Sequence, residues 1–315
     1  MSAFLRRLVV FGLVAVLAYP VLIFLFGLIL PGQLAGNVRY PLGAYGHMNT
    51  RMKEVQGQAP VDVLFIGSSH AYRGFDPRIW AKRGYSSFNL GSSAQTPIQS
   101  ELLLKQYLPT LRPRLVVMEV HPGPFREEGV ESAVDLMANR PVDAAISGMA
   151  WNMGDVMVCN TLLYAKVRQA LGMDDDFNED PVKDHDQYVN GGFVQRTKGG
   201  FVPVGKLRRE STTPSPEQWE AFQRILAYLR SQRCPVVLVE APMTRWMYEG
   251  LYADHHVFAD SMSGAGRYID MNGQVALTDT VHFFTKGHLD QAGVEIFNEA
   301  LLDTLEGRAW LPVKR

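Results

Sequence analysis

The chain has 315 residues, of which 47 % are apolar and 20 % charged, a balance typical of folded globular domains rather than of disordered or multi-span membrane proteins. At roughly 150 residues per domain, this length predicts one large domain or two small ones. Lys plus Arg (31) nearly balance Asp plus Glu (32), and a net charge of -1 argues against a general nucleic-acid binder. Cys159 and Cys234 lack metal-ligand spacing and imply no zinc site, and whether they form a disulfide is left open.

The N-terminal segment departs from this average. Residues 8–30 carry no charge, and at about 1.5 Å per residue a helix of this length, roughly 35 Å, spans a hydrocarbon core of about 30 Å. Arg6 and Arg7 precede the stretch, so the positive-inside rule predicts a cytoplasmic tail at residues 1–7. We expect a single-pass anchor in the cell (inner) membrane and a periplasmic or otherwise extracytoplasmic main domain. The alternatives are a cleaved signal peptide, whose apolar region would be shorter, and a buried soluble helix.

Residues 31–60 are rich in glycine and proline and predict a linker with one short helix at about residues 47–55. The globular domain is then residues 61–315. Within it, four short apolar runs, each ending at a glycine, proline or small polar residue, predict buried parallel strands. These runs are residues 61–66, 86–90, 115–120 and 235–240.

Helical patterns alternate with these runs. Residues 216–232 form an apolar stripe, with Ser215 as the expected N-cap and Gln218 completing a capping box. A last helix is expected at about residues 291–305, with Asp290 as its cap. Strands alternating with helices predict an α/β fold, a doubly wound and mainly parallel sheet sandwiched between helices.

The alternation fails at about residues 125–212, which we interpret as an insertion over the ligand-binding edge of the sheet. Its acidic run, residues 174–186, lacks the glycine and glutamate positions of a calcium-binding EF-hand loop, so a solvated loop is expected. The cations that follow, including Arg196 and Lys198, could meet an anionic glycan or a lipid headgroup, although a solvated surface is the simpler expectation.

Reactive side chains gather where the first strand ends. The run 61–66 leads into Gly67, Ser68, Ser69 and His70, and ligands bind at the carboxyl ends of parallel strands. A serine at the start of the following helix can act as a nucleophile while backbone N–H groups receive the oxyanion. A simple turn or a phosphate-binding loop would also fit this segment. His288, just before the last helix, supplies a possible general base.

This pair of segments resembles the SGNH/GDSL hydrolase superfamily. Gly67-Ser68-Ser69 matches the Gly-Asp-Ser block with Ser68 in place of Asp, Asn89-Leu90-Gly91 matches the second block, and His288, Asp290 and Gly293 fit the last. The resemblance implies a flavodoxin-like sandwich with Ser69 as nucleophile, His288 as base and the Gly91 amide as an oxyanion donor. It implies no cofactor and no metal.

Two positions depart from the family pattern. Thr285 stands where the family has the acid of an Asp-x-x-His pair, and His121 follows the third strand where the family has an oxyanion asparagine. We expect Asp279 to orient His288 from a neighbouring turn, and His121 to serve as a further oxyanion donor or as a histidine satisfied by its own turn. Asp279 and His282 offer an alternative Asp-x-x-His pair, ranked below His288 because it lacks the residues that begin the last helix. His70 is expected to cap the turn or line the cleft.

Within the superfamily, the chain looks most like membrane-tethered members linked to cell-envelope polysaccharide O-acylation, such as relatives of the alginate O-acetylation and teichoic-acid D-alanylation proteins. That likeness implies an O-acyltransferase or esterase acting on an exported glycan through an acyl-serine. Expected partners are an acylated glycan or acyl donor, a membrane-bound acyltransferase or polysaccharide synthesis and export complex, and the membrane itself, with no nucleic acid. The alternative is a catalytically silent glycan-binding or scaffolding subunit.

Overall fold

The computed structural model describes residues 3–30, 34, 36–252 and 254–314. The chain divides into two compact units, Met1–Leu42 with Ala133–Asn178 and Gly43–Ser132 with Glu179–Arg315. We call the first the anchor unit and the second the sheet unit. Residues 1–2 of the expected cytoplasmic tail, and residues 31–33 and 35 of the expected linker, lie outside the described residues.

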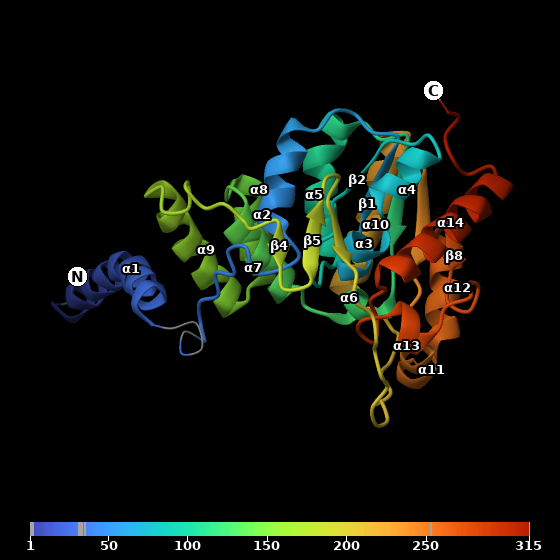
Figure 1. Ribbon diagram of the computed structural model, residues 1–315. Coiled ribbons are helices and arrows are strands. Elements are labelled where there is room, and N and C mark those ends of the chain that lie inside the picture. Colours follow the sequence, from blue (N-terminus) through green and yellow to red (C-terminus); the bar gives the residue numbers. More distant parts are fainter. Residues whose placement is uncertain (1–2, 31–33, 35, 253, 315) are drawn as a thin grey trace. The chain divides into compact units, whose positions relative to one another are not determined.

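The sheet unit is built on five parallel strands in the order β2-β1-β3-β7-β8 (Figure 1). They are β1 (Val63–Ile66), β2 (Ser87–Asn89), β3 (Leu115–Glu119), β7 (Val236–Glu240) and β8 (Arg267–Asp270). Four of them coincide with the predicted apolar runs, and the doubly wound α/β fold is confirmed. The fifth, β8, was not predicted because it is an edge strand in which Ile269 alone is fully buried, so its sequence shows no apolar run.

Helices cover both faces of this sheet. Val63 and Phe65 of β1 share one apolar cluster with Trp80 and Phe297, so α3 (Ser69–Gly74), α4 (Pro77–Lys82) and α14 (Gln291–Gly307) cover one face. Side chains alternate along a strand, so Leu64 points to the opposite face, where α5 (Pro97–Leu111) and α10 (Pro216–Ser231) pack together. The remaining helices of this unit are α2 (Met48–Glu54), η1 (Val55–Gly57), α6 (Pro122–Arg126), α11 (Arg245–Leu251), α12 (His255–Ala265) and α13 (Asp279–His282).

The two predicted helix caps are present. Ser215 Oγ accepts a hydrogen bond from the Gln218 N–H at the start of α10, and Asp290 Oδ1 accepts one from the Gly293 N–H at the start of α14. The Gln218 side chain, however, closes no capping box, because its Oε1 accepts the Ile98 N–H and the Ser215 N–H donates to the Phe125 carbonyl. The capping-box prediction was therefore wrong, because tertiary partners take both groups.

The segment expected to be a linker is partly a packed element. Met48, Met52 and Val55 of α2 and η1 are buried, and the Arg51 side chain is 0 % exposed with its Nε donating to the Gly192 carbonyl. Residues 43–60 therefore belong to the body of the sheet unit rather than to a tether. Glycine and proline mark turns in this segment, and such turns occur in compact structure as readily as in flexible chain.

The expected insertion is likewise not one piece. Its second half forms a three-stranded antiparallel sheet in the sheet unit, with β4 (Val182–Lys183), β5 (Asp186–Val189) and β6 (Phe193–Arg196). Its first half supplies α8 (Ala144–Met153), α9 (Val156–Ala170) and most of α7 (Val130–Asn139) to the anchor unit. The acidic run is only partly the expected solvated loop, because three of its carboxylates form ion pairs while its other four acidic residues are exposed. These pairs are Asp174 with Arg168, Glu179 with Lys183, and Asp186 with Arg73.

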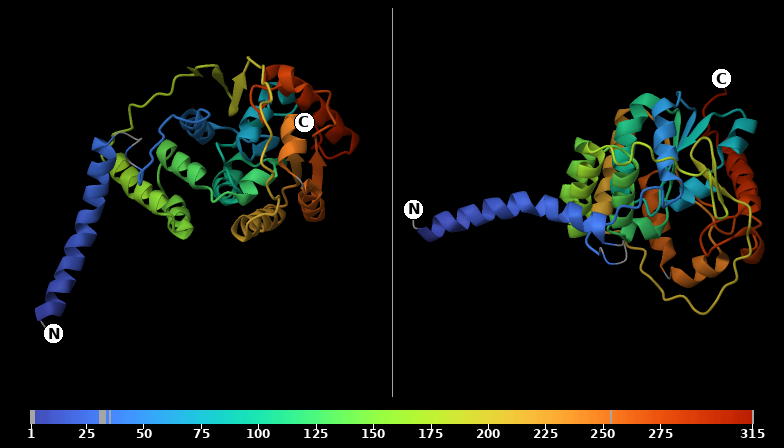
Figure 2. Two further views of the ribbon diagram at one scale, coloured as in Figure 1. Left: turned by 90° about the horizontal axis from the view of Figure 1, so that it is seen from below. Right: turned by 60° about the vertical axis from the view of Figure 1, so that its left-hand side comes forward.

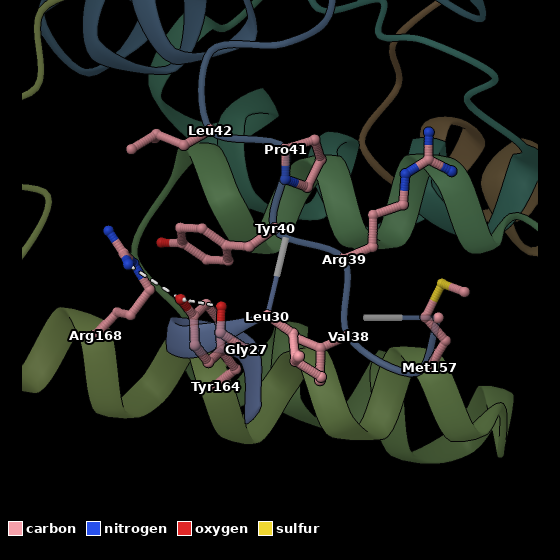
Figure 3. A pocket seen from close by; sticks show the side chains of 11 residues that line it. Gly27, Leu30, Val38, Arg39, Tyr40, Pro41, Leu42, Met157, Tyr164 and Arg168 are labelled. Carbon is pink, nitrogen blue, oxygen red and sulfur yellow. Dashed lines mark hydrogen bonds between the residues drawn. The ribbon is translucent and has the colours of Figure 1, made fainter. Parts of the chain in front are cut away.

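In the anchor unit, α1 (Ala3–Ile29) has no buried residue and is long and apolar enough to cross a membrane. Its C-terminal part packs on α9 (Figure 2). Tyr19 Oη donates to Asn160 Oδ1 at 2.6 Å, and Tyr164 Oη donates to the Gly27 carbonyl at 3.2 Å. A cavity of about 500 Å³ lies between the end of α1, residues 36–42 and α9 (Figure 3). None of the predicted site residues lines this cavity.

The packing of α2 gives a direct test of whether residues 43–60 are folded. Met52→Ala should lower the free energy of unfolding by about 2–5 kcal/mol, because it removes a buried side chain and leaves a cavity. Gln56→Ala, at an exposed position of the same segment, is the matched control and should stay within about 0.5 kcal/mol of wild type. Both values come from denaturant unfolding of the full chain in detergent. Equal stability of the two variants would restore the linker interpretation.

Candidate active site

The turn that follows β1 has a shape that only glycine supports. Gly67 has φ +148°, and a Cβ placed on it would lie 2.7 Å from Glu119 Cβ and 2.9 Å from the Glu119 carbonyl oxygen. A side chain there would therefore push β1 and β3 apart. After this turn Ser68 caps α3, its Oγ accepting the His70 N–H, and Ser69 is the first residue of the helix. Ser68 is buried, whereas Ser69 is partly exposed.

Ser69 and His288 meet although 219 positions separate them. His288 Nε2 lies 2.8 Å from Ser69 Oγ, within hydrogen-bond reach. The loop that carries His288 is held at both ends by backbone bonds, from the Asp290 N–H to the His282 carbonyl and from the Phe284 N–H to the His288 carbonyl. The structure thus brings together the predicted nucleophile and the predicted base.

Thr285 occupies the position behind the His288 ring. Thr285 Oγ1 lies 2.7 Å from His288 Nδ1 and also accepts the His288 N–H at 3.2 Å. The residue found at the family's acid position therefore contacts the ring in the place where a carboxylate would contact it. A hydroxyl can orient an imidazole, but unlike a carboxylate it adds no negative charge to stabilise the protonated ring.

Burial lowers the pKa of the His288 imidazole well below its usual value of 6.5. The electrostatic influence of four basic side chains lowers it further: His70, Arg73, His121 and Arg196. No counteracting carboxylate contacts the ring among the described residues. His288 is therefore neutral, and able to accept a proton, well into the acidic range.

Glu119, at the end of β3, ties the nucleophile turn to the next strand. Its Oε2 accepts hydrogen bonds from the Ser68 N–H at 3.1 Å and Ser68 Oγ at 2.9 Å, and its Oε1 pairs with His121 Nδ1 at 2.8 Å. Burial alone would raise the pKa of Glu119, but His121 and the other hydrogen-bond donors lower it to about 2. The pairing raises the pKa of His121 in turn. Glu119 and His121 therefore form a buried ion pair directly beneath the turn.

His70 lies against both of the other histidines. Its ring centroid is 4.2 Å from that of His121 and 4.9 Å from that of His288. Burial, with the charge on His121, lowers the pKa of His70 to about 3, so the ring is neutral. His70 Nε2 is buried without a hydrogen-bond partner among the described residues, and it packs against Gly287, where an added Cβ would approach it to 2.8 Å. The expectation that His70 lines the site fits this position.

Two predicted site residues have other roles in the structure. The Asp279 carboxylate accepts the N–H groups of Arg245 and Trp246 at the start of α11, so it serves that helix and not the His288 ring. The Gly91 N–H donates to Asn89 Oδ1 at 3.0 Å, so the donor expected there for an oxyanion is already used. A Cβ on Gly91 would lie 2.8 Å from Ala71 Cβ. Close packing against α3 explains this glycine, and both earlier assignments are corrected.

Two further expectations concern histidines. The alternative pair Asp279 and His282 does not form a catalytic unit, because His282 Nδ1 accepts the Thr278 N–H within its own turn. For His121, Nδ1 is taken by Glu119, so its use as an oxyanion donor through Nε2 stays a prediction.

Two groups of side chains could hold a metal ion on proximity alone. They are His70 with Glu119 and His121, and Glu240 with His255 and Asp270, each with potential ligand atoms within 4.8 Å of one another. In each group hydrogen bonds already join two of the three members: His121 Nδ1 with Glu119 Oε1, and His255 Nε2 with both oxygens of Glu240 at 2.9 Å. Internal pairing accounts for these groups, and we assign neither of them a metal.

Sequence reasoning missed the contributions of Thr285, Glu119 and Arg73, and it named an anionic ligand for Arg196 only as the less favoured alternative to a solvated surface. Thr285 was noted only as an absent acid, and Glu119 only as part of a mismatched block. A carboxylate at the end of the third strand, pointing at the edge where the serine turn lies, was the available signal for Glu119. Arg73 and Arg196 meet beside the site because Asp186 of β5 bonds to both of them. Nothing in the local sequence of β5 and β6 indicates these contacts.

Comparisons with known proteins give limited information. No family model and no curated protein sequence matches the chain. Among the solved structures that align with it are a GDSL-like lipase from Bacteroides thetaiotaomicron and a candidate acylhydrolase from Bacteroides fragilis. The lipase is 11 % identical to this chain with a TM-score of 0.41, and the match covers 84 % of this chain and 98 % of the lipase chain. The acylhydrolase is 10 % identical with a TM-score of 0.39, and the match covers 85 % of this chain and 96 % of the acylhydrolase chain. At these levels the site itself, and not the likeness, has to support any function.

The two serines of the turn should differ in what they contribute to stability. Ser68→Ala removes the cap of α3 and a buried hydrogen bond to the charged Glu119, so it should lower the free energy of unfolding by about 1–3 kcal/mol. Ser69→Ala removes one partly exposed hydroxyl and should change it by less than about 1 kcal/mol. Denaturant unfolding of the two variants measures the difference. A larger loss for Ser69→Ala would contradict this account of the turn.

Proposed function

We propose that this chain is a membrane-anchored SGNH-type serine enzyme that breaks or transfers acyl esters outside the cytoplasm. The observation that carries the proposal is the 2.8 Å contact between Ser69 Oγ and His288 Nε2 at the carboxyl end of a parallel strand. Ser69 is partly exposed and lies on a turn held by buried contacts. A nucleophile and a base within hydrogen-bond reach of each other, with a third group orienting the base, define nucleophilic catalysis.

The proposed reaction begins when His288 Nε2 takes the proton of Ser69 Oγ. The oxygen attacks the acyl carbonyl, and the tetrahedral intermediate collapses to an acyl-serine as His288 returns the proton to the departing alcohol. Water or a sugar hydroxyl then attacks the acyl-serine, again with His288 as base, and Ser69 is regenerated. Water as the second nucleophile makes the chain an esterase, and a sugar hydroxyl makes it an O-acyltransferase.

The reaction needs one particular tautomer of His288, which the Thr285 hydroxyl permits but, unlike a carboxylate, does not enforce. When His288 Nδ1–H donates to Thr285 Oγ1, the Nε2 lone pair faces Ser69. The missing carboxylate has a cost, because the acid of a Ser-His-Asp triad contributes up to about 10⁴-fold in turnover. We therefore propose a slow dyad enzyme.

The oxyanion is assigned to the Ser69 backbone N–H at the start of α3. With the Gly91 N–H engaged by Asn89, a second donor has to come from elsewhere, and the protonated His121 is our candidate. Each such donor is worth about 10²-fold or more in turnover.

The glycan substrate and the envelope location rest on the anchor and on the family resemblance. α1 is long and apolar enough to hold the enzyme at a membrane, and the arginines before its apolar stretch favour a cytoplasmic N-terminus. An acylated or exported polysaccharide is the proposed substrate. A membrane-bound acyltransferase or an export complex is the proposed partner.

The competing function is a silent scaffold that keeps the fold without chemistry. Thr285 at the acid position and the occupied Gly91 N–H favour it. The aligned Ser69 and His288 side chains favour the enzyme, because packing of the fold requires neither hydroxyl nor imidazole at these positions.

Covalent labelling distinguishes the two functions. The full chain in detergent should react with a fluorophosphonate at Ser69, to one label per chain by mass spectrometry. Ser69→Ala and His288→Ala should each abolish labelling and ester hydrolysis with little change in melting temperature. The double variant should be scarcely worse than either single one, because the two residues act as a unit. A folded wild-type chain that takes up no label would favour the scaffold.

The pH dependence follows from His288. The base works in its neutral form, and its lowered pKa keeps it neutral in mild acid, so kcat/KM should stay flat through pH 6.5 and fall only at lower pH. Thr285→Asp places a carboxylate behind the ring, which should raise that pKa, move the acid limb to higher pH and increase the plateau rate. Thr285→Val is the control and should lower the rate. An acid limb that does not move in Thr285→Asp would exclude His288 as the titrating base.

The orientation in the membrane can be tested separately. A periplasmically active reporter fused after the C-terminal Arg315 should be active, and a cytoplasm-dependent reporter fused at the same place should be silent. The reverse pattern would contradict the anchor orientation without touching the Ser69 chemistry.

A further inference from the structure

Two arginines converge beside the Ser69–His288 pair. Arg73 lies one helical turn after Ser69 in α3, a spacing that puts both side chains on the same face of the helix. Arg196 ends β6, where it is the cross-strand neighbour of Asp186 in β5. Asp186 joins the two arginines, with a bidentate bond to Arg73 at 3.0 and 2.6 Å and a single bond to Arg196 Nη1 at 3.1 Å.

Phe284 connects this cluster to the catalytic histidine. The guanidinium carbon of Arg196 lies 4.5 Å from the centre of the Phe284 ring, and that of Arg73 lies 5.2 Å from it. The Phe284 ring is nearly parallel to His288, with centroids 5.6 Å apart and an interplanar angle of 17°. The guanidinium groups are thus one aromatic ring away from the base.

The charges of the cluster do not balance. Two guanidinium groups share one carboxylate, so one positive charge is left beside the reaction centre, and the influence of both arginines at His288 supports this placement. Arg73 uses two nitrogens on Asp186 and its side chain is 12 % exposed, whereas that of Arg196 is 26 % exposed. Arg196 is therefore the member that a ligand can reach.

The hydrogen bonds of Arg196 are also incomplete. Nη1 is used by Asp186, but Nε is buried with no hydrogen-bond partner, and no partner of Nη2 occurs among the described residues. Nε has no exposed surface, so a ligand cannot reach it in this packing, whereas Nη2 is not among the buried donors and is the nitrogen open to a ligand. An Nη2–H of a guanidinium group donates a charge-assisted hydrogen bond to a carboxylate oxygen.

We propose that the free Nη2–H of Arg196 donates to a carboxylate of the ester substrate, with Asp186 and Arg73 holding the guanidinium in place. The inference rests on the serine ester chemistry proposed above and adds the substrate class, an ester whose acyl or alcohol part carries a negative charge. Arg196 is then a specificity residue, because it contacts the substrate away from the reacting carbonyl.

Matched esters test the inference with the full chain in detergent. For charge on the alcohol part, para-acetoxybenzoate is compared with its neutral methyl ester. For charge on the acyl part, mono(para-nitrophenyl) adipate is compared with para-nitrophenyl hexanoate. In at least one pair the wild type should prefer the anionic member in kcat/KM, and the pair that shows the preference identifies which part carries the charge.

Arg196→Gln should reduce that preference about five- to tenfold, as expected for the loss of one charge-assisted contact. Because each comparison is a ratio within one variant, a change in His288 basicity affects both esters and cancels. Lys198→Gln removes an equal charge two positions along the chain at an exposed site and should leave the preference unchanged. An unchanged ratio in Arg196→Gln, or a wild-type preference for the neutral ester in both pairs, overturns the inference.

A binding measurement separates this inference from the proposed function. The uncleaved amide para-acetamidobenzoate should bind the wild type by calorimetry, with neutral para-acetamidobenzamide and Arg196→Gln both showing at least about fivefold weaker binding. Arg196-dependent binding in a chain that neither labels nor hydrolyses would overturn the enzyme and keep the carboxylate site. Hydrolysis without charge preference would keep the enzyme and overturn the carboxylate site.

Discussion

One buried carboxylate holds the reactive turn in shape. Glu119 takes three hydrogen bonds, two from Ser68 and one from His121, and its Cβ and carbonyl oxygen lie where a side chain on Gly67 would be. The start of α3, and with it the direction of the Ser69 hydroxyl, depends on these contacts. Since a buried charge that loses its partner is strongly destabilising, the Glu119–His121 pair and the turn form one cooperative unit.

The site that includes this turn carries little uncompensated negative charge. The carboxylate nearest the turn is neutralised by His121, the position behind His288 is a hydroxyl, and two arginines lie beyond Phe284. Such a site disfavours a protonated base while it favours an anionic substrate. If that substrate binds, its own charge replaces part of what a triad carboxylate would supply, so binding and basicity are electrostatically coupled.

Local sequence patterns predicted the elements whose side chains are buried on a regular period. Four of the five strands of the parallel sheet and the helices that begin at Pro216 and Gln291 were found in this way, together with their caps. The family resemblance placed Ser69 and His288. Neither source could find β8, whose edge position leaves only Ile269 fully buried, or the partner of the His288 ring. Asp279 satisfied a spacing rule in the sequence, but the backbone N–H groups of α11 are closer partners for its carboxylate.

The arginine cluster and the packed segment at residues 43–60 were missed for a related physical reason. The local hydrophobicity pattern predicts surface positions for Arg73 and Arg51. In the structure each is largely removed from water by partners more than 100 positions away in the sequence. Burial of a charged side chain depends on a specific partner rather than on its neighbours in the chain. Patterns of hydrophobicity therefore mark such residues as surface.

The contact between α1 and α9 makes α1 one wall of the cavity in the anchor unit. Gly27 and Leu30 line the cavity of the anchor unit, and the ring of Tyr164 lies so close to Gly27 that any side chain there would collide with it. Removing the first thirty residues to obtain a water-soluble protein would open that cavity on one side and strip Asn160 of its tyrosine partner. The solubility and melting temperature of such a shortened protein would therefore reflect the loss of the α1 contacts as well as the properties of the remaining chain.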